Sequence, residues 1–203
     1  MTRARLLAFG LGAVGASVVL GADPGTTEST ALRPVTAFAD IKDPAQRSAA
    51  LFAEAGKVLM HPRCVNCHPA TDRPLQGMEG RPHEPRVRRG VGGHGVAAMR
   101  CATCHTAANY DAVGVPGNLR WALAPASMAW EGRSLAQICQ QIKDPARNGA
   151  RKLDAVVVHM TSDPLVGWAW APGVGREPAP GTQAAFGALV REWVKAGAAC
   201  PTP

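Results

Sequence analysis

The stretch CVNCHPA at residues 64–70 decides what this chain folds around, and CATCHTA at residues 101–107 repeats its pattern. Each stretch contains two cysteines separated by two residues, with a histidine directly after the second cysteine. Structural zinc sites, redox-active dithiols and covalent haem attachment sites all use cysteines spaced in this way. The choice among these three sites therefore determines the architecture that the sequence predicts.

The zinc and dithiol interpretations leave the two histidines unexplained. Two Cys pairs with 33 residues between them can supply four thiolates to one tetrahedral zinc, and spacing alone does not exclude this. A Cys₄ site, however, needs no histidine after each second cysteine. A thioredoxin-like dithiol belongs beside a βαβ pattern, and no stretch of this chain shows convincing strand alternation.

The pattern Cys-x-x-Cys-His is typical of c-type haem attachment. The two thiols add to the two vinyl groups of a haem, and the histidine supplies an imidazole nitrogen to the iron. The sequence therefore predicts two covalently bound haem c groups, each with its iron. Cys64, Cys67 and His68 would hold the first haem, and Cys101, Cys104 and His105 the second.

Residues 1–22 have the features of a signal peptide. Arg3 and Arg5 form a positive start, an apolar run extends from Leu6 to Leu20, and small residues follow. The alternative is an uncleaved anchor, but the run is shorter than the roughly 20 residues that span a bilayer. We expect a periplasmic protein without stable membrane insertion after cleavage, which agrees with haem attachment outside the cytoplasm.

The chain is basic, with 22 Lys and Arg against 15 Asp and Glu and a net charge of +7. Part of this charge lies in Arg81, Arg86, Arg88 and Arg89. We expect no nucleic acid partner, because the protein is predicted to be exported and no aromatic residue is interleaved with these arginines. They either form a solvated loop or pair with buried carboxylates such as haem propionates.

The expected fold is mainly α, with short helices and long Pro/Gly-rich loops wrapped around two covalently attached haems. One domain would cover residues 43–203, after a flexible segment over 23–42. With 5% aromatic residues, 22 Gly and 17 Pro, the chain has few large side chains for a core, and haems would supply apolar volume.

Apolar spacing and capping residues predict helices over 44–59, 134–143, 150–160 and 182–195, and a short helix from near Gly95. Residues 69–94 and 109–132 are expected to be irregular.

Cys139 and Cys200 remain outside the two motifs. Exported proteins tend to pair such cysteines, and each lies beside the apolar face of a predicted helix. We expect a Cys139–Cys200 disulfide without a catalytic role, the alternative being two buried thiols.

The residue in the open axial position of each iron decides between electron transfer and chemistry. We expect His83 and His159 to be the distal ligands, with no assignment of each to a haem. Met128 is the main rival because it lies in an irregular segment flanked by Trp121 and Trp130. The remaining rivals are Met160, His61 and His94, with Met60, Met78 and Met99 weaker.

Three segments together resemble a family of small exported dihaem c-type cytochromes described as isoquinoline 1-oxidoreductase subunits. They are MHPRCVNCHP (60–69), LRWALAPASMAWEGRS (119–134) and HMTSDPLVGWAWAPGVGREPAPGTQ (159–183). The resemblance covers roughly 45–202 and implies an electron-transfer partner of a molybdenum hydroxylase. The chain lacks the further cysteines of an iron–sulfur subunit and the length of a molybdopterin subunit.

Electron transfer is the preferred function: the protein would carry single electrons from a periplasmic dehydrogenase to a respiratory acceptor. The alternative is a dihaem enzyme with one open iron, such as a peroxidase or a dehydrogenase of small sulfur compounds. A haem-based sensor is the third hypothesis, and no attached signalling segment is visible in its favour.

Overall fold

The computed structural model describes Met1 and residues 31–202, and the predicted signal peptide at 1–22 lies outside the described residues apart from Met1. The chain is mainly helical. Its α-helices are α1 (Pro44–Leu59), α2 (Pro62–Val65), α3 (Leu135–Lys143), α4 (Leu153–Ser162), α5 (Pro164–Gly167) and α6 (Gln183–Lys195). The 3₁₀ turns are η1 (Val35–Phe38), η2 (Val91–Gly93), η3 (Cys101–Thr103), η4 (Asp111–Val113), η5 (Ala126–Met128) and η6 (Trp168–Trp170).

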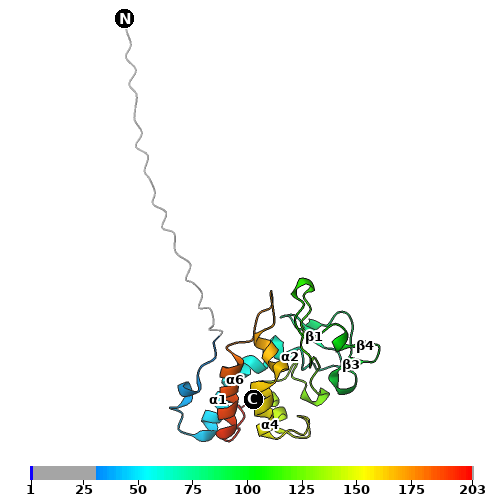
Figure 1. The fold of residues 1–203 in the computed structure, drawn as a ribbon. Coiled ribbons are helices and arrows are strands. Elements are labelled where there is room, and N and C mark those ends of the chain that lie inside the picture. The colour runs from blue at the N-terminus through cyan, green and yellow to red at the C-terminus, as the bar shows by residue number, and fades with distance from the viewer. Residues whose placement is uncertain (2–30, 203) are drawn as a thin grey trace.

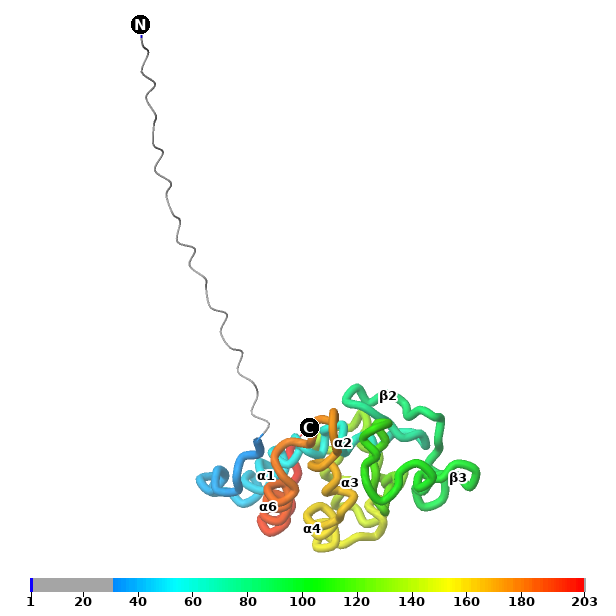
Figure 2. The backbone as a smooth tube through the Cα atoms, turned by 45° about the horizontal axis from the view of Figure 1, so that its top comes forward, coloured from blue at the N-terminus to red at the C-terminus, as the bar shows by residue number. Residues whose placement is uncertain are grey.

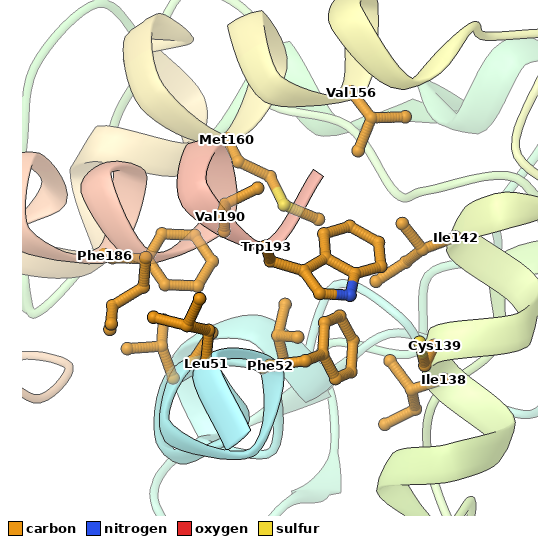
Figure 3. Close-up of a cluster of buried hydrophobic side chains, with 14 of the residues drawn as sticks. Leu51, Phe52, Ile138, Cys139, Ile142, Val156, Met160, Phe186, Val190 and Trp193 are labelled. Atoms are coloured by element: carbon orange, nitrogen blue, oxygen red, sulfur yellow. The ribbon is translucent and has the colours of Figure 1, made fainter. Parts of the chain in front are cut away.

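The four longest helices form one core. α6 packs on both α1 and α4 (Figure 1), and α3, labelled in Figure 2, contacts α1. Trp193 lies at the centre of this core with Phe52, Ile142 and Met160 around it, and its ring centroid is 4.7 Å from that of Phe52 (Figure 3). A fully buried tryptophan removes a large apolar surface from water, which is the main favourable contribution to folding.

The predicted helices over 44–59, 134–143 and 182–195 are confirmed, because local caps fix their starts. Asp43 accepts a hydrogen bond from the backbone N–H of Gln46 (2.7 Å), with Pro44 at the first helical position. Ser134 forms a capping box with Gln137, and Thr182 caps α6. A side chain that accepts from the first turn satisfies a donor that the helix leaves free. The helix predicted over 150–160 is confirmed as α4.

A disulfide joins Cys139 on α3 to Cys200 beyond α6, as the sequence predicted. Cys139 is completely buried and belongs to the same apolar cluster as Trp193. Gly197, just after α6, has a φ of +100°, which suits the left-handed residue that ends many helices. The chain thus turns back sharply toward α3.

The other half of the molecule, between α2 and α3, is built from turns and two short hairpins (Figure 1, Figure 2). β1 (Leu75–Gln76) pairs with β2 (Arg81–Pro82), and β3 (Gly95–Val96) pairs with β4 (Met99–Arg100), both antiparallel. The short helix expected from near Gly95 is therefore wrong. Gly95 has a φ of +85°, which a helix does not accept, and the second motif begins in a 3₁₀ turn instead.

Residues 31–42 differ from the flexible segment that the sequence predicted over 23–42. Phe38 in η1 is only 3% exposed and joins the helical core. The backbone N–H of Arg33 donates to the carboxylate of Glu54 (2.9 Å) on α1. This part of the segment is therefore packed on the domain. Among the described residues, none of the helices has the length and hydropathy of a membrane span.

Replacing both Cys139 and Cys200 with Ala should lower the free energy of unfolding by about 4 kcal/mol, because a bridge across 61 residues of sequence restricts the unfolded chain. Asp43→Ala, which removes one helix cap, should cost about 1 kcal/mol. Denaturant unfolding of the oxidised protein measures both. A disulfide effect no larger than the cap effect would contradict this account of the core.

Candidate functional site

The first motif lies on a helical turn that begins with α2. Its backbone hydrogen bonds run from Cys67 N to Cys64 O (3.1 Å) and from His68 N to Val65 O (2.9 Å). Residues three apart on such a turn share one side, so Cys64 and Cys67 are held together as a pair. Burial raises the pKa of Cys64 to about 12 and that of Cys67 to about 11.

The second motif follows β4 directly and forms the turn η3. Cys104 N donates to Cys101 O (3.2 Å) and His105 N to the same oxygen (2.9 Å). Cys101 is half-buried, whereas Cys104 is exposed. A charge on Cys101 further raises the pKa of Cys67. The two motifs therefore lie within electrostatic range of one another.

The two motif histidines are held in the same way. The Nδ1 of His68 donates to the carbonyl oxygen of Met128 (2.7 Å), and the Nδ1 of His105 donates to that of Pro116 (2.7 Å). Since a carbonyl only accepts, each ring carries its proton on Nδ1 and presents the lone pair of Nε2. Imidazoles that bind a metal are usually fixed by such a hydrogen bond on their other nitrogen.

Each motif histidine also stacks on a tryptophan. The rings of His68 and Trp130 are 3.6 Å apart and those of His105 and Trp121 are 4.5 Å apart, both with 10° between the planes. Trp168, from the loop after α5, meets Trp121 edge-on at 4.9 Å. Its indole N–H donates to Asn109 Oδ1 (2.9 Å). The imidazole orientations are thus fixed by packing as well as by hydrogen bonds.

The two histidines predicted as distal ligands differ in their links to the motifs. The ring of His83 is 5.9 Å from the ring of His105, whereas His159 is linked to the first motif by an electrostatic effect that lowers the pKa of His68. His83 Nδ1 donates to Pro85 O (3.0 Å), and His159 Nδ1 to the carboxylate of Asp163 (3.1 Å). Both rings therefore present Nε2, as the motif histidines do.

The remaining two histidines differ. His61 Nδ1 accepts a hydrogen bond from the backbone N–H of Arg63 (3.2 Å), so its neutral ring carries the proton on Nε2 and offers no lone pair there. His94 is exposed, and none of the hydrogen bonds among the described residues involves its side chain. Nδ1 hydrogen bonding to an oxygen thus separates four of the six histidines from the other two.

Three of the half-buried histidines have a lowered pKa, which favours the neutral form that metal binding requires. Burial lowers the pKa of His68 to about 4, against the opposing effect of the Met128 carbonyl. Burial likewise lowers the pKa of His105 and of His159, where Pro116 and Asp163 respectively oppose it.

The methionines have other roles in the structure. Met128 is 8% exposed within the core, and its carbonyl contacts His68 on the side of the ring away from Nε2. Met160 packs among Trp193 and Val190 (Figure 3). Met60 and Met99 are exposed. None of these positions favours a methionine over the histidines, and the ligand assignment itself stays a prediction.

Buried polar atoms without partners gather beside the first motif. Among the described residues, five side-chain N or O atoms are buried without a hydrogen bond, including Arg89 Nε, Trp130 Nε1 and Asn66 Oδ1. Arg89 also donates to the carbonyls of Ala124 and Thr71, and its charge lowers the pKa of His68. Unsatisfied buried donors in a native protein indicate a missing partner. Arg89 Nε and Trp130 Nε1 suit a carboxylate such as a haem propionate.

One short segment connects the two motifs. Leu123 N donates to Gly93 O (2.9 Å), just before the second motif, and Ala124 N donates to Cys67 O (3.0 Å) in the first. Gly93 has a φ of +80°, and a Cβ there would collide with the carbonyl oxygen of Leu123. A glycine is thus required for this close approach.

The zinc interpretation finds no support in the geometry. Nowhere in residues 31–202 do three His, Cys, Asp or Glu side chains converge as a metal-binding group. The four motif cysteines are also unpaired with one another. The strands of the described chain are two residues long and antiparallel, so the βαβ setting of a thioredoxin-like dithiol does not occur there. The haem interpretation stays a prediction.

Several residues of this site were not expected from the sequence. Trp121 and Trp130 were noted only as neighbours of Met128, although they stack on the motif histidines. Asp163 lies four residues after His159, the spacing at which helical side chains meet. That spacing was a signal in the sequence. No pattern in the sequence indicated the roles of Asn109 or of the carbonyls of Met128 and Pro116.

Comparisons with protein-family models, with curated proteins and with solved structures gave no match for this chain.

In the protein without any bound group, Cys104 should react with iodoacetamide much faster than Cys64 and Cys67 at pH 8. With pKa values of about 12 and 11, the half-buried Cys64 and Cys67 should hold about a thousandth or less of their thiol as thiolate at pH 8. Their rates should rise about tenfold per pH unit below those values. Mass spectrometry of the labelled peptides measures this, with Cys139 and Cys200 as unreactive controls. Equal rates at all four motif cysteines would refute the raised pKa values of Cys64 and Cys67.

Proposed function

We propose that this protein is a periplasmic dihaem c-type cytochrome that carries single electrons from a dehydrogenase to a respiratory acceptor. The observation that carries the proposal is the shared state of four histidines: His68, His83, His105 and His159 all donate Nδ1–H to an oxygen. A bound haem would supply one reversible one-electron couple, so two haems would accept two electrons one at a time.

The residues that would hold each haem come from both halves of the molecule. In each motif both thiols would add across the haem vinyl groups, forming one C–S bond per cysteine and transferring each thiol hydrogen to carbon. We assign His83 with His105 to the second haem, and His159 with His68 to the first. The 5.9 Å between the ring centroids of His83 and His105 supports the second pair, and the first pair takes the remaining two of the four histidines.

Two histidines on each haem iron would leave no position for peroxide or another small substrate. This ligand set therefore favours a carrier over an enzyme. Tryptophan stacking and the Nδ1 hydrogen bonds restrict movement of the motif rings, so little rearrangement would accompany electron transfer. The resemblance of residues 45–202 to dihaem subunits of isoquinoline oxidoreductases supports a molybdenum hydroxylase as the donor.

The matured protein should contain two low-spin irons that do not respond to cyanide or peroxide. His83→Ala and His159→Ala should each convert about half of the haem to a high-spin form that binds cyanide, since each removes one axial ligand. Visible, near-infrared and electron paramagnetic resonance spectra measure this. His94→Ala is the matched control, because that side chain is exposed. A high-spin signal in the unmodified protein would instead favour the enzyme alternative, and absence of covalent haem would refute the proposal.

Asp163→Asn should raise the reduction potential of one haem only. The carboxylate accepts the Nδ1 proton of His159 and increases electron donation by that ring, which favours the oxidised iron. Each tenfold decrease in the equilibrium ratio that favours the oxidised iron raises the reduction potential by about 59 mV. Asn keeps the cap that Asp163 provides to Leu165 N (2.8 Å), so the fold should persist. Spectroelectrochemical titration measures both potentials, with Asp154→Asn on α4 as control; an equal shift of both haems would contradict the assignment.

A further inference from the structure

Two buried hydrogen-bond donors beside the first motif have no acceptor in the described chain. They are the Nε of Arg89 and the indole Nε1 of Trp130, and Trp130 as a whole is 5% exposed. Leaving a buried donor unpaired costs free energy, so native structures pair nearly all of them. The two atoms therefore point to an acceptor that the polypeptide does not supply.

Both residues are attached to the backbone of the first motif. The backbone N–H of Trp130 donates to the carbonyl of His68 (2.8 Å), and the Trp130 ring stacks on the His68 ring at 3.6 Å. The guanidinium of Arg89 reaches the carbonyl of Pro69, the next residue along the chain (3.5 Å). Both donors thus belong to the surroundings of the histidine that would bind the first iron.

Arg89 is held in place by carbonyls and is not neutralised. Its terminal nitrogens donate to the carbonyls of Thr71 (3.0 Å) and Ala124, but it forms no ion pair with any described residue. The carboxylate of Asp72 is paired with Arg88 instead (3.5 Å). Burial lowers the pKa of Arg89, and the charge of Asp72 opposes this shift. The result is a fixed, partly desolvated positive charge without its own anion.

The chemistry of a haem c restricts what the acceptor can be. Apart from the iron, the edge of such a haem carries hydrocarbon groups and two propionates, and only the propionates accept hydrogen bonds. A carboxylate accepts strongly from a guanidinium and also from an indole N–H, which can only donate. The two unpaired donors therefore match the polar groups of a haem bound at His68.

We propose that Arg89 and Trp130 bind the propionates of the first haem, Arg89 through Nε and Trp130 through Nε1. This inference rests on the proposed function and adds to it a residue that sets a potential. A propionate charge favours the oxidised iron, which carries one more positive charge than the reduced iron. The positive charge of Arg89 would offset that effect and raise the reduction potential of the first haem.

The second motif has no equivalent pair of donors. Trp121, which stacks on His105, is half-buried, and its indole nitrogen is not among the buried atoms that lack a partner in residues 31–202. None of those atoms belongs to residues 101–107 either. The effect of Arg89 and Trp130 is therefore expected at one haem only.

Trp130→Phe tests the hydrogen bond, because phenylalanine keeps an aromatic ring beside His68 and lacks the N–H. In the matured full-length protein, this change should shift the propionate bending band of one haem in the resonance Raman spectrum. Trp121→Phe is the matched control, since it removes an indole stacked on His105, and it should leave the propionate bands unchanged. An unchanged band in Trp130→Phe, or equal shifts in the two variants, would overturn the proposal.

Arg89→Gln tests the charge. It should lower the equilibrium ratio of reduced to oxidised first haem at least tenfold, which is a fall of about 59 mV in the reduction potential. The control Arg88→Gln removes a positive charge from a side chain that is 61% exposed, and it should change the ratio less than twofold. Spectroelectrochemical titration resolves the two couples. Equal effects of the two variants, or an equal shift of both haems, would contradict the role of Arg89.

The two tests also separate the possible failures. If Arg89→Gln does not mature, the Raman comparison of Trp130→Phe with Trp121→Phe decides the proposal by itself. Intact low-spin haems whose propionate bands ignore Trp130→Phe would refute this inference and leave the proposed function standing. Absence of covalent haem, or of a reversible couple in the unmodified protein, would refute the proposed function itself.

Discussion

Two hydrogen bonds, each 2.7 Å long, constrain the loop-rich part of this structure: those from the rings of His68 and His105 to the carbonyls of Met128 and Pro116. A helix or sheet uses its carbonyls internally, so an acceptor for a side chain has to come from irregular backbone. The chain between α2 and α3 therefore has to stay free of long regular elements. The tryptophans that stack on the two rings lie in the same irregular segment, which explains why so few aromatic residues suffice.

The elements that could be predicted are those whose signals are local. Asp43, Ser134 and Thr182 each mark a helix start within three residues of the groups they satisfy, so α1, α3 and α6 followed from the sequence. The region around Gly95 failed because its conformation depends on distant backbone. Gly95 bonds to Arg89, and its neighbour Gly93 is held against Leu123, about thirty residues further along. The residues near Gly95 in the sequence give no signal of the contact between Gly93 and Leu123.

The candidate site likewise contains residues that a local sequence pattern predicts and others that depend on contacts visible only in the structure. The motif cysteines and histidines follow from a five-residue pattern, and His83 and His159 were selected only as members of a short set of candidates. What singles them out in the structure is the acceptor at Nδ1, and for His83 this is a carbonyl two residues away. Asp163 was within reach of the sequence, since it lies one helical turn after His159. The partnerless donors of Arg89 and Trp130 become visible only when burial is known.

The two cysteines of the Cys139–Cys200 disulfide and the four motif cysteines lie in different parts of the fold. Its sulfur atoms belong to the helical core, while the four motif cysteines lie on turns outside the longer helices. For a chain that is exported as proposed, oxidation and haem attachment compete for thiols in one compartment. A core that brings Cys139 and Cys200 together through α1, α3 and α6 would favour the correct bridge before the loops are arranged. If haems are attached as proposed, this early bridge would leave the four motif thiols reduced for the attachment.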